Sequence, residues 1–119
     1  MNRDFVIELS DLIKSLDGNL SKIQSGFDTY QNNRFEQKKS EFFCLELNGE
    51  AGELANLEKK SWKGKLIDVS RFEDEAADVF IALINYCNAK GISLEKSVIK
   101  KLQWIENKRL ELENSGEKY

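Results

Sequence analysis

The stretch LELNGEAGELA at residues 45–55 and the stretch DEAADV at residues 74–79 decide the fold of this chain. Both read as helix, and each carries two acids three residues apart, which lie about one turn apart on one side of a helix. These acids are Glu50 and Glu53 in the first stretch, and Glu75 and Asp78 in the second. Apolar residues share the arc of each pair, so we expect the acids on buried faces, where unpaired carboxylates are costly.

The composition is that of one helical domain. The chain has 119 residues, a net charge of −3, no proline and no histidine, with 40% hydrophobic and 33% charged residues. This length supports a single modest core, so we expect one domain over residues 1–119. The absence of histidine excludes Ser-His-Asp triads, Cys-His pairs and histidine-containing zinc sites. The basic residues form no stripe, so we expect no nucleic-acid partner. Because no apolar run is long enough to span a membrane, we expect no membrane association and a cytoplasmic location.

The hydrophobic periodicity predicts helices along most of the chain. Ser70 with Glu73 has the form of a capping box at the start of one helix, and Gly91 is the expected stop of that helix. Ser93 is the expected N-cap of the last helix. We expect helices at about residues 4–16, 21–33, 37–60, 70–90 and 93–113, followed by a frayed tail at 115–119.

The helix expected at residues 70–90 is apolar almost all round, which is typical of the centre of a bundle. Its one polar strip holds Glu75, Asp78 and Asn85. A short connection joins it to the helix at 37–60, so we expect these two helices to pack antiparallel. The predicted fold is therefore all-α, a four- to five-helix bundle whose two central helices are antiparallel and carry the acidic motifs. A bundle this small, with so apolar a helix, is expected to assemble as an oligomer, a homodimer at least.

Four acids that face one another across a helix pair need a cation to offset their repulsion. Ligands that offer only oxygen favour a hard divalent ion, so we expect Mg²⁺, with Mn²⁺ as a substitute. Lysines near such a site would bind phosphate oxygens, and Asn85 shares the acids' strip. The lysine candidates are Lys60, Lys63, Lys65, Lys101 and Lys108. The alternative is a bundle whose acids pair with lysines or lie at a subunit boundary. Glu8 and Asp11 have the same spacing but project away from an apolar stripe, so we expect them to be solvated.

These two motifs resemble those of the MazG-like all-α nucleotide pyrophosphohydrolases, a superfamily that includes dCTP and dUTP pyrophosphatases. That superfamily carries Glu-x-x-Glu, a variable spacer and then Glu-x-x-Asp. The sequence GEAGELA and the sequence KGISLE, which starts at Lys90, are also similar to sequences of that superfamily. The resemblance covers about residues 24–109, and we expect residues 1–20 to form an added N-terminal helix outside it.

The resemblance implies Mg²⁺-dependent hydrolysis of a nucleoside triphosphate between its α and β phosphates, by a dimer or a tetramer. Position by position, it makes Glu50, Glu53, Glu75 and Asp78 the metal ligands and catalytic residues. An early helix would form part of the base pocket, which brings in Phe27, Tyr30 and Gln31, and Trp62 lies where relatives place an aromatic residue. For these aromatic residues, a core position is the alternative. One departure concerns the substrate contacts, because Ile105 stands where relatives have an asparagine four residues after Lys101.

Two other functions are compatible with the same sequence. A phosphoribosyl-ATP or dUTP hydrolase would differ from a general nucleotide pyrophosphatase only in the base and sugar pocket. A non-catalytic helical interaction or assembly protein with a carboxylate cluster would need no Mg²⁺-dependent turnover at all.

Overall fold

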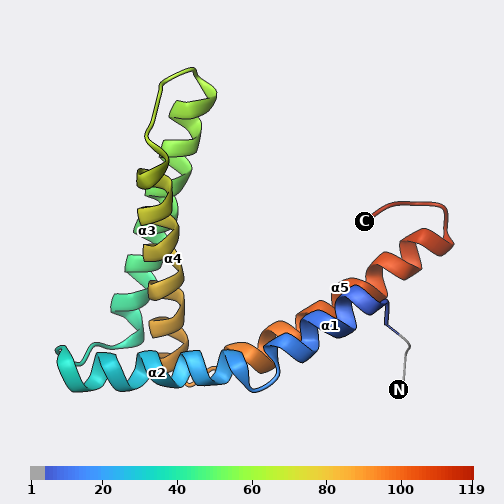
Figure 1. The fold of residues 1–119 in the computed structure, drawn as a ribbon, viewed down its shortest axis with the longest axis horizontal. Helices are drawn as coiled ribbons and strands as arrows, with labels where there is room; N and C mark the ends of the chain where they lie inside the picture. Colours follow the sequence, from blue (N-terminus) through green and yellow to red (C-terminus); the bar gives the residue numbers. More distant parts are fainter. Residues whose placement is uncertain (1–4) are drawn as a thin grey trace. The chain divides into compact units, whose positions relative to one another are not determined.

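The structure of the chain, a computed structural model, describes residues 5–119 (Figure 1). Its elements are all helices: α1 (Ile7–Leu16), α2 (Asn19–Arg34), α3 (Ser40–Trp62), α4 (Val69–Lys90) and α5 (Leu94–Asn114). The all-α prediction is confirmed over these residues, and residues 115–119 follow α5 without further helix. Within residues 5–119, no helix combines the length and the apolar character that a membrane span requires.

The chain forms two compact units. We call Gln24–Ile92 the hairpin unit, since it contains α3, α4 and the second half of α2. We call the residues up to Ile23 together with Ser93–Tyr119 the terminal unit, which contains α1, the start of α2 and α5. Each unit is described by itself below.

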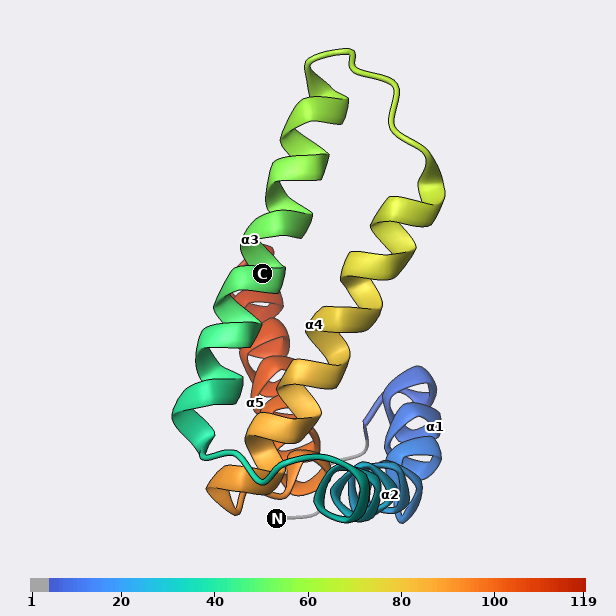
Figure 2. The same ribbon diagram turned by 90° about the vertical axis from the view of Figure 1, so that its left-hand side faces the viewer.

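In the hairpin unit, α3 and α4 lie side by side and a loop at residues 63–68 joins them at one end (Figures 1 and 2). Their contact forms a narrow core in which Ile84 is fully buried. The other buried apolar residues of this unit are Phe43, Leu57, Ala82 and Cys87. Many large apolar side chains stay exposed on the single chain, among them Phe42, Leu45, Trp62, Leu66, Phe80 and Ile81. The pair of helices therefore buries only part of the apolar surface that the sequence provides.

Polar side chains fix α2 to the far end of α4. The Gln24 amide donates a hydrogen bond to the Ile92 carbonyl at 2.6 Å, and the Asn88 amide donates to the Gln24 carbonyl at 2.9 Å. The rings of Phe27 and Phe80 pack edge to face, with centroids 6.0 Å apart. These contacts hold the second half of α2 across the end of the hairpin.

The helix ends show which capping predictions were right. The Asp68 carboxylate accepts a hydrogen bond from the Ser70 N–H at 2.9 Å, so Asp68 is the N-cap of α4 and the predicted Ser70 cap is wrong. Gly91 ends α4 as predicted, with a left-handed φ of 73° that favours glycine. The Ser93 hydroxyl accepts from the Lys96 N–H at 3.3 Å, which confirms Ser93 as the N-cap of α5.

The terminal unit packs α1 against α5 (Figure 1). Leu9 is buried in this contact, while Ile7 remains largely exposed. Glu106 is buried and accepts a hydrogen bond from the Arg109 guanidinium, which also pairs with Glu113. The helix expected at 4–16 begins at Ile7, and the part of the predicted added segment at residues 1–4 lies outside the described residues.

Candidate functional site

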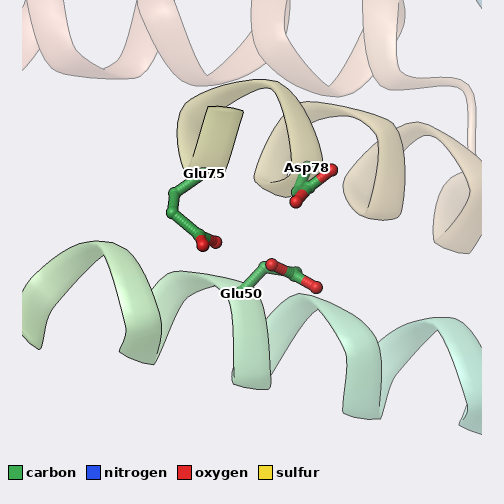
Figure 3. A group of neighbouring side chains, drawn as sticks. All are labelled: Glu50, Glu75 and Asp78. Atoms are coloured by element: carbon green, nitrogen blue, oxygen red, sulfur yellow. The ribbon is translucent and has the colours of Figure 1, made fainter. Parts of the chain in front are cut away.

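Three of the four predicted acids meet at the contact between α3 and α4. Glu50 comes from α3, and Glu75 and Asp78 come from successive turns of α4 (Figure 3). Each can offer one carboxylate oxygen such that all three oxygens lie within 4.8 Å of one another. All three residues are half-buried. The helical spacing of the two motifs thus produces a compact carboxylate cluster, as the sequence predicts.

Glu53 differs from this expectation. It lies one turn after Glu50 on α3, but it is exposed and is not among the three acids that converge. Its charge nevertheless acts on the cluster, because it contributes to the raised pKa values of Glu50 and Glu75. Glu53 therefore lies beside the cluster rather than on the buried face that the periodicity indicated.

The cluster is electrostatically unfavourable without a cation. A hydrogen bond with Glu75, followed by desolvation and by the charges of Asp78 and Glu53, raises the pKa of Glu50 to about 7. The hydrogen bond with Glu50 lowers the pKa of Glu75, but desolvation and the neighbouring negative charges outweigh it, so that pKa is also raised. Crowding of the carboxyl groups therefore favours a proton on Glu50 near neutral pH.

No lysine or arginine in the described part of the chain forms a salt bridge with these acids. In addition, Oε2 of Glu75 is buried and has no hydrogen-bond partner there. A buried carboxylate oxygen without a partner is costly, and a divalent cation would satisfy it. The donor set consists only of carboxylate oxygens, which fits a hard ion such as Mg²⁺. Glu50, Glu75 and Asp78 are the residues that would hold it.

The predicted phosphate-binding lysines of the hairpin unit lie toward the loop. Lys60 follows Glu50 by ten residues on α3, about 15 Å along the helix axis. Lys63 and Lys65 come still later, in the exposed loop after α3, beside the exposed Trp62. The structure therefore does not bring these side chains of a single chain to the carboxylate cluster.

The two predicted lysines of α5 belong to the terminal unit. The Lys101 ammonium lies over the ring of Trp104, 4.3 Å from its centroid. Lys108 makes a marginal ion pair with Glu111, at 4.0 Å. Within the terminal unit, the partners of these two lysines are therefore an aromatic ring and a glutamate.

A polar cavity of about 710 Å³ lies in the hairpin unit, where α2 crosses the end of α3 and α4. Two of the predicted substrate residues line it, Gln31 and Asn85, whereas Tyr30 is exposed and packs its ring on Phe35. Other lining residues are Asn32, Lys38, Ser40, Phe43 and Asn88. Of these, sequence reasoning missed Asn88, although its position three residues after Asn85 on a helix places it on the same side.

Comparisons with models of protein families, with curated proteins and with solved structures returned no match for this chain. The interpretation of the site therefore depends on the carboxylate cluster, on the cavity and on the sequence motifs.

Proposed function

We propose that this chain is an Mg²⁺-dependent nucleoside triphosphate pyrophosphohydrolase, which cleaves a (deoxy)nucleoside triphosphate between its α and β phosphates. The products would be the monophosphate and pyrophosphate, and the role would be to clear unwanted nucleotides from the pool. The observation that carries the proposal is the convergence of Glu50, Glu75 and Asp78 without a cationic partner among the described residues. A cavity lined by amide side chains in the same unit supports a nucleotide as the substrate.

Each acid has a role in this proposal. Glu50, Glu75 and Asp78 bind Mg²⁺ or Mn²⁺, and Glu53 completes the set from beside the cluster, as the resemblance implies. When bound, the ion would neutralise phosphate charge and lower the pKa of a bound water. The carboxylates are the groups of this site that can accept the proton of that water. Gln31 and Asn85 would contact the nucleoside in the cavity.

We further propose that two copies complete the bundle. On the single chain, the large apolar side chains Leu45, Phe80 and Ile81 of the hairpin unit are exposed. An antiparallel α3–α4 pair from a second copy would cover them in a four-helix arrangement. Sedimentation should therefore report a dimer or a tetramer, and a 13.7 kDa monomer at micromolar concentration would contradict this assembly.

The test of the activity is a panel of nucleoside triphosphates with Mg²⁺, with pyrophosphate and orthophosphate release resolved from each other. We expect pyrophosphate and monophosphate, with turnover lowered by roughly 100-fold or more in Glu75→Gln. Glu8→Gln is the matched control, because Glu8 has an acid three residues later but is exposed on α1. Equal turnover by wild type and Glu75→Gln would refute the assignment of the site.

A second candidate is a non-catalytic helical assembly protein that uses the carboxylate cluster as a structural cation site. The exposed apolar residues of α3 and α4 favour this reading as much as they favour an oligomeric enzyme. Failure to hydrolyse any nucleotide with Mg²⁺ or Mn²⁺, in a protein that binds the ion, would support it.

A further inference from the structure

The buried amide of Asn85 has an acceptor that no group of the described chain satisfies. Asn85 is only 6% exposed, and its Nδ2 donates to Oε1 of Gln31 at 3.5 Å. Its Oδ1 is buried without a hydrogen-bond partner, although it belongs to a residue that lines the polar cavity. Buried acceptors are nearly always paired, so this oxygen indicates that a donor from outside the chain belongs beside it.

Asn85 stands in a fixed relation to the carboxylate cluster. It follows Asp78 by seven residues, or two helical turns, so it lies on the same side of α4 about 10 Å further along. Phe43, which also lines the cavity, precedes Glu50 by the same seven residues on α3. The cavity at the end of the hairpin and the cluster further inside therefore follow each other along both helices. That is the order in which the base and the phosphates of a nucleotide follow each other.

The two carboxylates of the cavity wall are poorly placed to select a ligand. Asp28 and Glu41 are exposed, and Oδ1 of Asp28 already accepts from the Asn32 amide at 3.0 Å. When an exposed carboxylate binds a ligand, it replaces a hydrogen bond to water by one to the ligand. The net gain is small, so such a carboxylate discriminates little between ligands. The Asn88 side-chain amide donates to the Gln24 carbonyl at 2.9 Å, which fixes its orientation. Of the buried acceptors without a partner in residues 5–119, Oδ1 of Asn85 is the one on the cavity wall, so we assign selection by hydrogen bonding to Asn85.

We propose that the cavity binds the base of the nucleotide, and that Oδ1 of Asn85 selects bases with an exocyclic amino group, cytosine or adenine, over their oxo counterparts. This inference rests on the proposed function. An amino group donates to the unpaired oxygen and satisfies it. An oxo group at the same position brings a second acceptor against it and leaves both unpaired, which is the situation in which a polar site rejects an analogue strongly.

The test compares matched substrates, CTP with UTP and ATP with ITP, which exchange an amino for an oxo group at the edge of the ring. We expect kcat/KM to favour the amino member of each pair by about tenfold or more. Asn85→Ala should bring both ratios close to one. Asn33→Ala is the control, because Asn33 is exposed on the same helix as Gln31, and this variant should keep the preference. Equal or reversed ratios in the wild-type protein would overturn the proposal, whether or not Asn85→Ala folds.

A binding measurement separates this inference from the proposed activity. Hydrolysis of all four triphosphates at equal rates would leave the proposed function standing and refute the role of Asn85. If no triphosphate is hydrolysed, the proposed function fails, and calorimetry with CMP and UMP in EDTA then decides about the base. Tighter binding of CMP that is lost in Asn85→Ala would support the selection. Equal affinities, or no binding of either monophosphate, would overturn it.

Discussion

The Glu95 carboxylate accepts a hydrogen bond from the Ser21 backbone N–H at 3.1 Å, so a residue in the first turn of α5 caps the first turn of α2. This bond is the main reason why the pKa of Glu95 lies below its ordinary value; burial opposes it, and the N–H groups of Gly18 and Leu20 add to it. The positive end of a helix favours a carboxylate over a carboxylic acid. Glu95 therefore stabilises the terminal unit in its ionised form.

This relationship predicts a loss of stability in acid. Because the pKa of Glu95 is lowered in the folded state, its contribution is fully present above the unfolded value of 4.5 and is lost as the pH falls from 4.5 through the lower folded value. Glu95→Gln should melt below the wild type at pH 7 and converge with it in acid. Thermal melts monitored by circular dichroism between pH 7 and pH 3 would show this. Glu117→Gln, in the exposed tail, should follow the wild type throughout.

The carboxylate cluster predicts the opposite pH dependence when no divalent ion is present. The pKa of Glu50 is raised from 4.5 to about 7, so the folded state holds a proton that the unfolded state releases. Stability should therefore fall as the pH rises from about 4.5 to 7 and should stay low above 7. Glu50→Gln should flatten this slope in EDTA.

Divalent ions should reverse that loss. Mg²⁺ should raise the melting temperature of the wild type at pH 8 more than at pH 5, because it competes with the protons of the cluster. Asp78→Asn should weaken the response, while Asp11→Asn, on α1, should retain it. A melting temperature that does not respond to Mg²⁺ or Mn²⁺ at pH 8 would speak against a metal site at this cluster.

Ile84 is the fully buried side chain of the hairpin unit, and its truncation leaves a cavity in a narrow core. We expect Ile84→Ala to lower the free energy of unfolding by about 2–5 kcal/mol. Leu66 is 98% exposed, so Leu66→Ala should change it by less than about 0.5 kcal/mol. Urea titrations of the three proteins at one concentration would measure both values. Similar losses in the two variants would contradict the core described here.

The two cysteines should react at different rates. Both cysteines lie in apolar stretches of helices, but Cys44 is exposed on α3, whereas Cys87 is buried on α4. Burial also raises the pKa of the Cys87 thiol, which lowers the fraction of reactive thiolate. A thiol reagent at pH 8 should label Cys44 quickly and Cys87 only upon unfolding, and mass spectrometry of the Cys44→Ser variant would isolate the slow site. Fast labelling of that variant would show that Cys87 is accessible.

The helices could be predicted from the sequence because the signals for them are local. Gly91 is a clear example, since a left-handed residue at the end of a helix is nearly always glycine. The start of α4 was placed wrongly because both Asp68 and Ser70 are good N-cap residues, and the sequence alone does not say which of them the backbone turns around. The structure assigns the cap to Asp68.

The candidate site could be predicted only in part. The spacing of the motifs correctly joined Glu50 with Glu75 and Asp78, because helical periodicity determines which side chains face the partner helix. The exposure of Glu53 could not be derived, since a helix pair covers a narrower arc than a complete bundle does. The cavity around Asn85 could not be predicted either, because it depends on how α2 crosses the hairpin. No local sequence pattern specifies that crossing.

The loop after α3 is a site where the chain can be cleaved without disturbing the carboxylate cluster. Residues 63–66 are exposed, and Gly64 holds a left-handed φ of 93°, which glycine adopts without steric cost. Trypsin should nick the native protein first after Lys63 or Lys65, since loop tips are the preferred sites of cleavage. The same position should accept an inserted affinity tag or fluorescent label, because Glu50 and Asp78 lie several turns away along both helices.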